Sequence, residues 1–392
     1  MKTSACVMLV AAEPSGDALG AALAEALQSN ADVRLIGVGG PLMGRRGIVS
    51  PFDITPLSVL GVFDALAAYP VVKRRALEVG EMAARERPDA VVLIDSWGFN
   101  LRVAHAIRQR LPGARLIKYV GPQVWATRPG RARTLAKAVD HLLTIHSFDA
   151  PWFERARLAT TFVGNPVLAA PQGGGDPARI RARIGAAPDD PVLVVAPGSR
   201  RGEVERLMGP FGEAVRRLSA DRTALKTVIL AADAVAGLVA ARAVNWKSTP
   251  LIVGEAERQD AMAAATAALA CSGTVTTEFA LAGAPMVVAY RLDPPTAAIA
   301  KMLIRTSFIT LMNVAAGREI APEFVQGACT GRRLAAALAP LLDDPSARAQ
   351  QSAAQSEALT LMRGGIHNPA GAAARAVMAQ LPAPQTRASI GL

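Results

Sequence analysis

The sequence has few cysteines and no long hydrophobic run. Its three cysteines, Cys6, Cys271 and Cys329, are spread over 392 residues. An odd, widely spaced set argues against a disulfide framework and fits a reducing compartment with buried thiols. No stretch of about 18 uninterrupted apolar residues occurs, so we expect no membrane-spanning helix. Zinc-ligand spacing is also absent, which excludes a zinc-finger class of site.

Aromatic residues are scarce at 4%, whereas the formal net charge is +11. Basic proteins attract nucleic acids, anionic membranes or phosphorylated substrates, although part of the charge can lie on solvated helix faces. We expect no nucleic-acid partner, because no aromatic-basic platform or helix-turn-helix signal is evident. No Walker motif and no Asp-x-Asp couplet at a strand end is found either. A bound diphosphate would therefore be neutralised by arginines and helix dipoles, with no metal and no cofactor.

Hydrophobic residues make up 51% of the chain and recur in strand-length runs separated by helical segments. This alternation predicts an α/β protein with two doubly wound, Rossmann-like domains facing a cleft. A glycine-rich linker at 171–177 divides residues 1–170 from 171–365, and 366–392 should form a helix and a disordered tail. The expected strands are 2–12, 33–40, 90–94, 115–120, 141–146, 160–163, 192–196, 226–231, 251–253, 267–271 and 286–290.

The most informative stretch is 269–291, where a strand, a small-residue turn, a helix and a second strand follow one another. Small residues at such a turn let a ligand approach the backbone, and the helix N-terminus attracts an anion. Glu278 can accept hydrogen bonds from a ribose diol, and Arg291 can add positive charge. The pattern fits a sugar nucleotide, or an ordinary strand-helix-strand unit with a capping serine. The turn itself consists of Ser272, Gly273 and Thr274.

A second possible anion site follows strand 192–196, where Ser199 and Arg200 precede a helix. The turn after the first strand is also a position where doubly wound folds bind ligands. Asp17 in that turn can contact a substrate or simply cap a helix. The other candidates in that turn are Glu13, Ser15 and Gly16.

Asp95 follows the apolar run 90–94, at the end of a strand where parallel sheets gather catalytic groups. A carboxylate beside an aromatic residue and a glycine can serve as general base for a hydroxyl. A helix cap or an ion pair with arginine explains the same spacing equally well. The loop 121–131, which contains Gln123 and Trp125, is rich in glycine, proline and cations.

Two apolar segments, 57–72 and 294–311, lie next to or contain cations. The first is followed at once by Lys73, Arg74 and Arg75. A buried core helix with a basic C-terminal turn explains this pattern, because the helix dipole favours cations there. An apolar patch on an anionic membrane surface explains it as well.

With these stretches in view, the sequence resembles the lipid-A-disaccharide synthase family, in order, over most of residues 5–342. The resemblance implies an inverting GT-B type glycosyltransferase with the UDP-sugar in the second domain and the acceptor in the first. It implies transfer from UDP-2,3-diacylglucosamine to 2,3-diacylglucosamine 1-phosphate (lipid X) without a metal. The matching motifs are EPSGDALGA, LIDSWGFN, YVGPQVWATR, APGSRRGEVE, CSGTVTTE, AGAPMVVAYR and NVAAGREI.

By position, the resemblance gives Asp95 the role of the base and places Arg200 near the diphosphate. Glu278 and Asn313 match nucleotide-contact positions, and Arg318 is expected on the acceptor side. Acylated substrates favour the membrane interpretation of both apolar segments. We therefore expect a cytoplasmic protein, peripheral on the inner face of the inner membrane, that can form a homodimer.

The sequence departs from the family pattern at two positions. Gly98 stands where a second acid is usual, three residues beyond Asp95, and Asn165 replaces a frequent histidine after Gly164. Two rival functions remain open. One is another enzyme of this architecture, such as a UDP-N-acetylglucosamine 2-epimerase, and the other is a non-catalytic protein that binds lipid or UDP-sugar.

Overall fold

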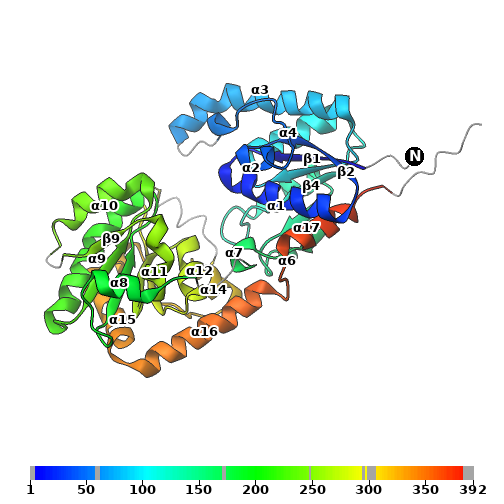
Figure 1. The fold of residues 1–392 in the computed structure, drawn as a ribbon. Helices are drawn as coiled ribbons and strands as arrows, with labels where there is room; N and C mark the ends of the chain where they lie inside the picture. Colours follow the sequence, from blue (N-terminus) through cyan, green and yellow to red (C-terminus); the bar gives the residue numbers. More distant parts are fainter. Residues whose placement is uncertain are drawn as a thin grey trace, which may run out of the picture. The chain divides into compact units, whose positions relative to one another are not determined.

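The computed structural model describes residues 5–57, 62–169, 174–246, 249–293, 296–297 and 306–382; for 62–68 it describes the backbone alone. The chain forms two compact units (Figure 1). The first comprises Met1–Ala169 together with Ile366–Leu392, and the second comprises Ala170–Gly365. Among the described residues, no helix is both long and apolar enough to cross a membrane.

The first unit is built on a six-stranded parallel sheet in the order β2-β1-β3-β4-β5-β6. Its strands are β1 (Ala5–Ala11), β2 (Val33–Val38), β3 (Ala90–Ile94), β4 (Leu116–Tyr119), β5 (His141–Thr144) and β6 (Thr160–Phe162). Its helices are α1 (Pro14–Asn30), α2 (Pro41–Gly44), α3 (Val62–Glu86), α4 (Trp97–Arg110), α5 (Gly130–Ala138), α6 (Ala150–Glu154), α7 (Pro166–Ala169) and α17 (Pro369–Met378).

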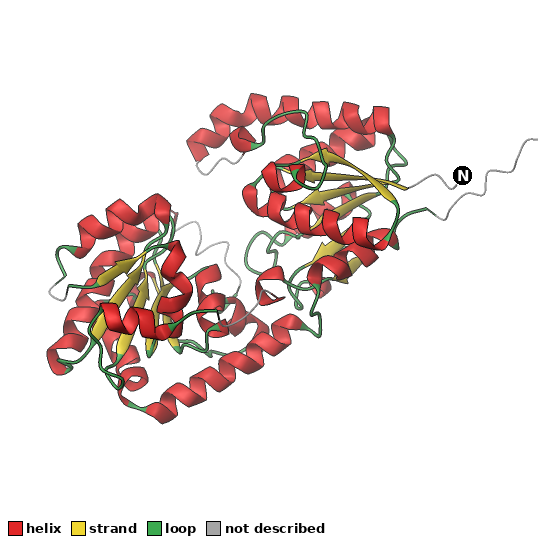
Figure 2. Cartoon of the chain, in the orientation of Figure 1, coloured by secondary structure: helices red, strands yellow, loops and turns green. Residues whose placement is uncertain are grey.

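The second unit repeats the pattern with the order β12-β11-β10-β7-β8-β9, again parallel throughout (Figure 2). Its strands are β7 (Val192–Ala196), β8 (Lys226–Leu230), β9 (Leu251–Val253), β10 (Ala267–Cys271), β11 (Met286–Tyr290) and β12 (Glu323–Val325). Its helices are α8 (Pro177–Arg183), α9 (Arg201–Asp221), α10 (Ala236–Ala243), α11 (Arg258–Ala263), α12 (Thr274–Leu281), α14 (Leu311–Ala316), α15 (Gly331–Asp343) and α16 (Pro345–Arg363).

Helices cover both faces of the first sheet, which explains why its strands are almost continuously apolar. Alternate residues of a strand point to opposite faces. Met8 and Val10 therefore join a core with α3, α4 and α5, whereas Val7 and Leu9 join a second core with α1 and α17. The expected α/β class with two doubly wound sheets is confirmed. β12 was not predicted from the sequence.

The C-terminal helix α17 belongs to the first unit although it follows the second in sequence. Its alanine-rich face packs into the core that also holds Leu23 and Leu27 of α1. Ala373 and Val377 are completely buried there. Small side chains on α17 let the two helices approach closely, so the end of the chain completes the core of its beginning.

The basic triplet at 73–75 lies in the middle of α3, which continues to Glu86. The expectation of a basic C-terminal turn at this point was therefore wrong. Arg74 and Arg75 both pair with Glu78, and the Arg75 guanidinium lies 4.6 Å from the centroid of the Phe52 ring. Of the two proposed membrane segments, 58–61, 294–295 and 298–305 lie outside the described residues.

We predict that Ala373→Leu destabilises the first unit by about 1–3 kcal/mol, because a well-packed core cannot accept the added carbons without strain. Arg375→Leu places the same side chain at an exposed position of the same helix and should cost far less. Urea unfolding followed by circular dichroism measures both variants. Equal stabilities would show that α17 does not pack in this core.

Candidate functional site

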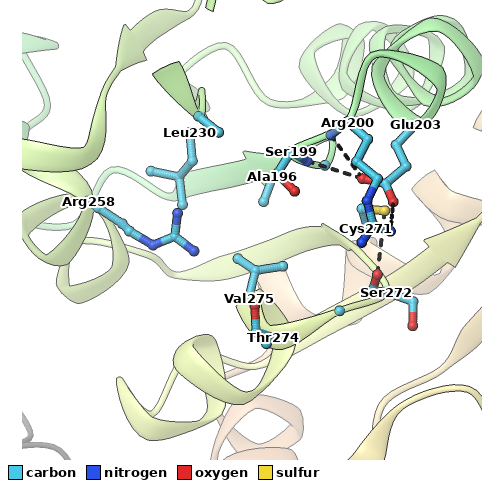
Figure 3. Close-up of a pocket in the computed structure, with 13 residues that line it drawn as sticks. Ala196, Ser199, Arg200, Glu203, Leu230, Arg258, Cys271, Ser272, Thr274 and Val275 are labelled. Carbon is cyan, nitrogen blue, oxygen red and sulfur yellow. Dashed lines mark hydrogen bonds and ion pairs between the residues drawn. The ribbon is translucent and has the colours of Figure 1, made fainter. Parts of the chain in front are cut away.

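Each sheet has one point where the chain order reverses, and doubly wound folds bind ligands beyond the strand ends at this point. In the second unit the reversal lies between β7 and β10, which pair directly. The last residues of both strands, Ala196 and Cys271, line a cavity of about 280 Å³ (Figure 3). The sequence-predicted turns Ser199–Arg200 and Ser272–Thr274 are thereby brought to one cavity.

A buried carboxylate shapes the turn after β7. Glu203 accepts hydrogen bonds from the backbone N–H groups of Ser199 and Arg200 through Oε2, at 3.1 and 3.2 Å. Gly198 has φ +111°, and a Cβ there would lie 2.5 Å from Glu203 Oε2, so only glycine fits. These two N–H groups are therefore not free for a ligand anion. The cation here is the Arg200 guanidinium, whose side chain is 69% exposed.

One backbone donor of the turn after β10 is already used, because the Ser272 N–H bonds to the Ala289 carbonyl at 3.2 Å. Ser272, Gly273 and Thr274 line the cavity. The Thr276 hydroxyl donates to the Gly273 carbonyl at 2.7 Å and holds the turn closed. Because the first N–H groups of α12 have no acceptor within the helix, they form a donor set suited to phosphate oxygens.

Sequence reasoning missed Arg258, which enters the cavity from the side opposite Arg200 (Figure 3). Its Nε donates to Glu278 Oε2 at 2.6 Å, and its Nη1 lies 3.3 Å from Glu255 Oε2. Arg258 is 20 positions before Glu278, so no local spacing signalled the pair. Glu278 is not among the described residues that line the cavity, and its carboxylate is held by Arg258, which does line it.

Two residues that were expected to contact the nucleotide make other hydrogen bonds in the structure. Arg291 does not line the cavity; its guanidinium donates to the carbonyls of Gln326 and Cys329 at 3.2 and 2.7 Å. Asn313 is fully buried, and all four of its amide hydrogen-bonding positions are satisfied. Its oxygen accepts from the Ile320 and Ala321 N–H groups, and its nitrogen donates to the Ala321 carbonyl and Glu323. Both residues shape loops, and the expectation of direct contact is not supported by this geometry.

In the first unit the reversal lies between β1 and β3. There the hydroxyl of Ser15, in the first turn of α1, donates to Asp95 Oδ2 at 2.8 Å, which joins two sequence-predicted residues 80 positions apart. Asp95 and Ser96 have φ values of +50° and +32°, a conformation that costs energy for residues other than glycine. The Asn100 side chain holds this turn by donating to the carbonyls of Ile94 and Asp95 at 2.7 and 3.0 Å.

A buried lysine, also missed from sequence, lies beneath the same turn. Lys118 Nζ donates to the Leu93 and Tyr119 carbonyls, both at 3.2 Å, and to the Asp95 carbonyl. Burial lowers the pKa of Lys118 to about 7, although the Asp95 and Glu13 carboxylates act to raise it. Through these hydrogen bonds, Lys118 links the carbonyl of the strained Asp95 turn to backbone carbonyls of β3 and β4.

The remaining first-unit candidates have mainly structural contacts. Asp17 is buried and accepts from the N–H groups of Gly40, Leu42 and Met43 at 2.8–3.0 Å. Asp17 lies inside α1, which begins at Pro14, so it is not the N-cap of that helix. Its carboxylate instead binds the backbone at the start of α2. A Cβ on Gly16 would lie 3.3 Å from that of Ala11, which explains the small residue.

Trp125 is buried, and its indole N–H donates to Asp149 Oδ1 at 3.0 Å. Burial raises the pKa of Asp149 to about 7, although the Trp125 hydrogen bond acts to lower it. Gln123, by contrast, is exposed. Arg318 lies in the second unit, where it pairs with Glu357 at 3.3 Å.

The structure shows which groups surround the two residues that depart from the family pattern. A Cβ at Gly98 would meet only Arg102 Nη1, at 3.6 Å, so an acid could fit there beside a cation. Asn165 is buried, and its Oδ1 accepts from the Val167 N–H at 3.0 Å. Within the described ranges, no group of three or more His, Cys, Asp or Glu side chains is arranged to hold a metal ion.

Solved structures share the fold at low sequence identity. A UDP-N-acetylglucosamine 2-epimerase from Neisseria meningitidis bound to UDP-GlcNAc gives a TM-score of 0.60 at 11% identity, covering 96% of this chain and 100% of that chain. A glycosyltransferase from Rickettsia africae gives a TM-score of 0.59 at 11% identity, covering 96% and 98%. Identities this low establish the architecture and leave the reaction open.

Sequence comparison is more specific. The family model described as lipid-A-disaccharide synthetase matches residues 7–377. The lipid-A-disaccharide synthase of Rhodospirillum centenum is 41% identical over 377 residues, covering 95% of this chain and 94% of the relative. That of Ruegeria pomeroyi is 41% identical over 387 residues, covering 96% and 95%. The chain belongs to the lipid-A-disaccharide synthase family.

Proposed function

We propose that this chain transfers 2,3-diacylglucosamine from UDP to the 6-hydroxyl of 2,3-diacylglucosamine 1-phosphate, forming a β(1→6) disaccharide and UDP. The observation that carries the proposal is the family match over residues 7–377. The cavity at the β7–β10 reversal and the Ser15–Asp95 pair at the β1–β3 reversal support it independently. Both sites lie where this fold class binds ligands.

The proposed chemistry needs one base and one anion-stabilising site. Inversion requires a carboxylate that takes the proton of the acceptor hydroxyl as it attacks the anomeric carbon. Asp95 has this role, with the Ser15 hydroxyl orienting its Oδ2. Arg200 and the α12 N-terminus would stabilise the charge that grows on the departing diphosphate. Because these groups are cationic or neutral donors, we propose that the reaction needs no metal.

Glu278 is the proposed partner of the ribose diol. Its Oε2 is held by Arg258, and a carboxylate can accept hydrogen bonds from both hydroxyls. The position of Arg258 in the cavity lining supports a role for this pair in the same site.

We further propose that the enzyme works as a peripheral protein on the inner face of the inner membrane, with the segments 57–72 and 294–311 contacting lipid. In the described part of this region, Tyr69 is 49% exposed and Arg74 is also exposed. Aromatic rings and cations suit the headgroup layer of an anionic membrane. A homodimer is compatible with this arrangement and is proposed as well.

The experiment that tests the function is release of UDP from UDP-2,3-diacylglucosamine. UDP appearing only when lipid X is present supports the proposal. A 2-epimerase would instead act on UDP-N-acetylglucosamine without an acceptor, and a non-catalytic binding protein would release no UDP.

We predict that Asp95→Asn lowers kcat by about 10²–10⁴-fold, because the amide cannot accept the hydroxyl proton. The Kd for UDP should stay unchanged, since Asp95 belongs to the other unit. Asp32→Asn removes an exposed carboxylate from the same unit and serves as the control. Steady-state kinetics and calorimetric UDP binding measure both quantities, and an unchanged kcat would remove Asp95 from the mechanism.

We predict that Lys118→Met lowers kcat more than it raises KM, because the lysine supports Asp95 through the backbone. The pKa of about 7 in the folded protein lies below the roughly 10.4 of an exposed lysine. Between these pH values the unfolded chain binds more protons, so wild-type stability must rise with pH relative to the variant. Urea unfolding of both proteins from pH 7 to 10 measures the difference, and parallel curves would contradict the assignment.

We predict that Glu278→Gln weakens UDP binding by about 10-fold or more, as expected for loss of charge-assisted hydrogen bonds. Binding of 2′-deoxy-UDP should weaken less, because one of the two hydroxyls is already missing. Glu255→Gln, which alters the other carboxylate near Arg258, is the matched control. Equal losses for both nucleotides would show that Glu278 does not contact the ribose diol.

A further inference from the structure

Two arginines lie beside the Asp95 turn without an assigned function. Trp97 begins α4 two residues beyond Asp95. The Arg131 guanidinium, from the first turn of α5, lies 5.0 Å from the centroid of the Trp97 ring. Arg128 precedes α5 with φ +50°, a left-handed conformation that is costly for arginine. The Arg131 N–H bonds to the Arg128 carbonyl at 2.9 Å, which keeps the two residues together.

Within the part of the chain that the structure describes, this pair has no counter-charge. Across the described residues, neither Arg128 nor Arg131 has a side-chain hydrogen bond or a carboxylate partner. Nearby Arg108 pairs with Asp140, and Arg102 donates to the Gly98 carbonyl. Burial, and secondarily the charge of Arg128, lower the pKa of Arg131. Two cations thus lie close together, and one of them is half-buried. An anion bound beside them would stabilise their charged forms.

The geometry suits a phosphate group. A guanidinium presents a planar fork of donors that matches phosphate oxygens, and an aromatic ring beneath it keeps the fork in a defined orientation. Stacking on Trp97 leaves the edge of the Arg131 guanidinium free to donate. Trp97 lies two residues beyond Asp95, so a ligand phosphate on Arg131 would bind next to the turn that carries Asp95.

We propose that Arg128 and Arg131 bind the phosphomonoester of the acceptor sugar and so direct its opposite end, the hydroxyl at C6, to Asp95. The inference rests on the proposed function, in which the acceptor carries a 1-phosphate. One pyranose ring separates the phosphate from the nucleophile. The arginine pair is therefore a specificity device that selects phosphorylated acceptors and sets their orientation.

The test is acceptor selectivity. The Arg131→Gln variant is compared with wild type on lipid X and on 2,3-diacylglucosamine without the phosphate. We expect kcat/KM for lipid X to fall about 10–100-fold, the range of a charge-assisted contact. The value for the unphosphorylated acceptor should change less than about 3-fold, and KM for the UDP-sugar should not change. Arg133→Gln, an exposed arginine on the same helix, is the matched control.

Each other outcome has a defined meaning. Equal losses on both acceptors, or equal effects of Arg131→Gln and Arg133→Gln, would overturn the inference in favour of a structural or general charge effect. A phospholipid headgroup offers the same chemistry, so both variants are also sedimented with phosphatidylglycerol-containing vesicles. Loss of vesicle binding with acceptor selectivity retained would assign the pair to the membrane and overturn the inference. Wild type that releases no UDP with lipid X would instead refute the proposed function.

Discussion

The structure depends on a constraint of parallel sheets. Their strands are buried on both faces, so polar groups reach the surface mainly in the loops at the strand ends. In each unit the chain order reverses once, between β1 and β3 or between β7 and β10. The loops diverge at these reversals and leave room for ligands. Asp95 and the Arg200 cavity lie at corresponding reversals. The same architectural rule thus gives each unit one position suited to a ligand.

Buried charge then shapes each site. Glu203 binds the backbone of the turn after β7, and Lys118 binds the carbonyls around the turn after β3. Burying an ion is costly unless hydrogen bonds satisfy it. Both ions are satisfied by backbone groups, so each stabilises one particular loop conformation. The Arg200 side chain is exposed, and Asp95 is half-buried.

Much of the fold could be predicted from the sequence, because apolar runs of strand length separated by amphipathic helices specify a doubly wound protein. β7, β9, β10 and β11 have the predicted bounds. Segment 57–72 was harder, because the cations that follow it at 73–75 suggested a helix end, whereas the helix continues to Glu86. Asp17 was left open between a substrate contact and a helix cap, and Asn313 was matched to a nucleotide contact, yet both bind backbone groups. A polar residue in a loop motif looks the same in sequence whether it faces a ligand or a neighbouring turn.

By itself the sequence determined the class of fold, the family, and the loops in which the functional residues lie, because local patterns and motif order carry that information. Only the tertiary structure decided which side chains reach the sites. It placed Arg258 against Glu278 across 20 positions, Lys118 under Asp95, and Arg131 over Trp97. It also showed that the side chains of Arg291 and Asn313 hydrogen-bond to backbone groups. These outcomes depend on contacts between distant strands and helices, and no local spacing in a chain encodes such distances.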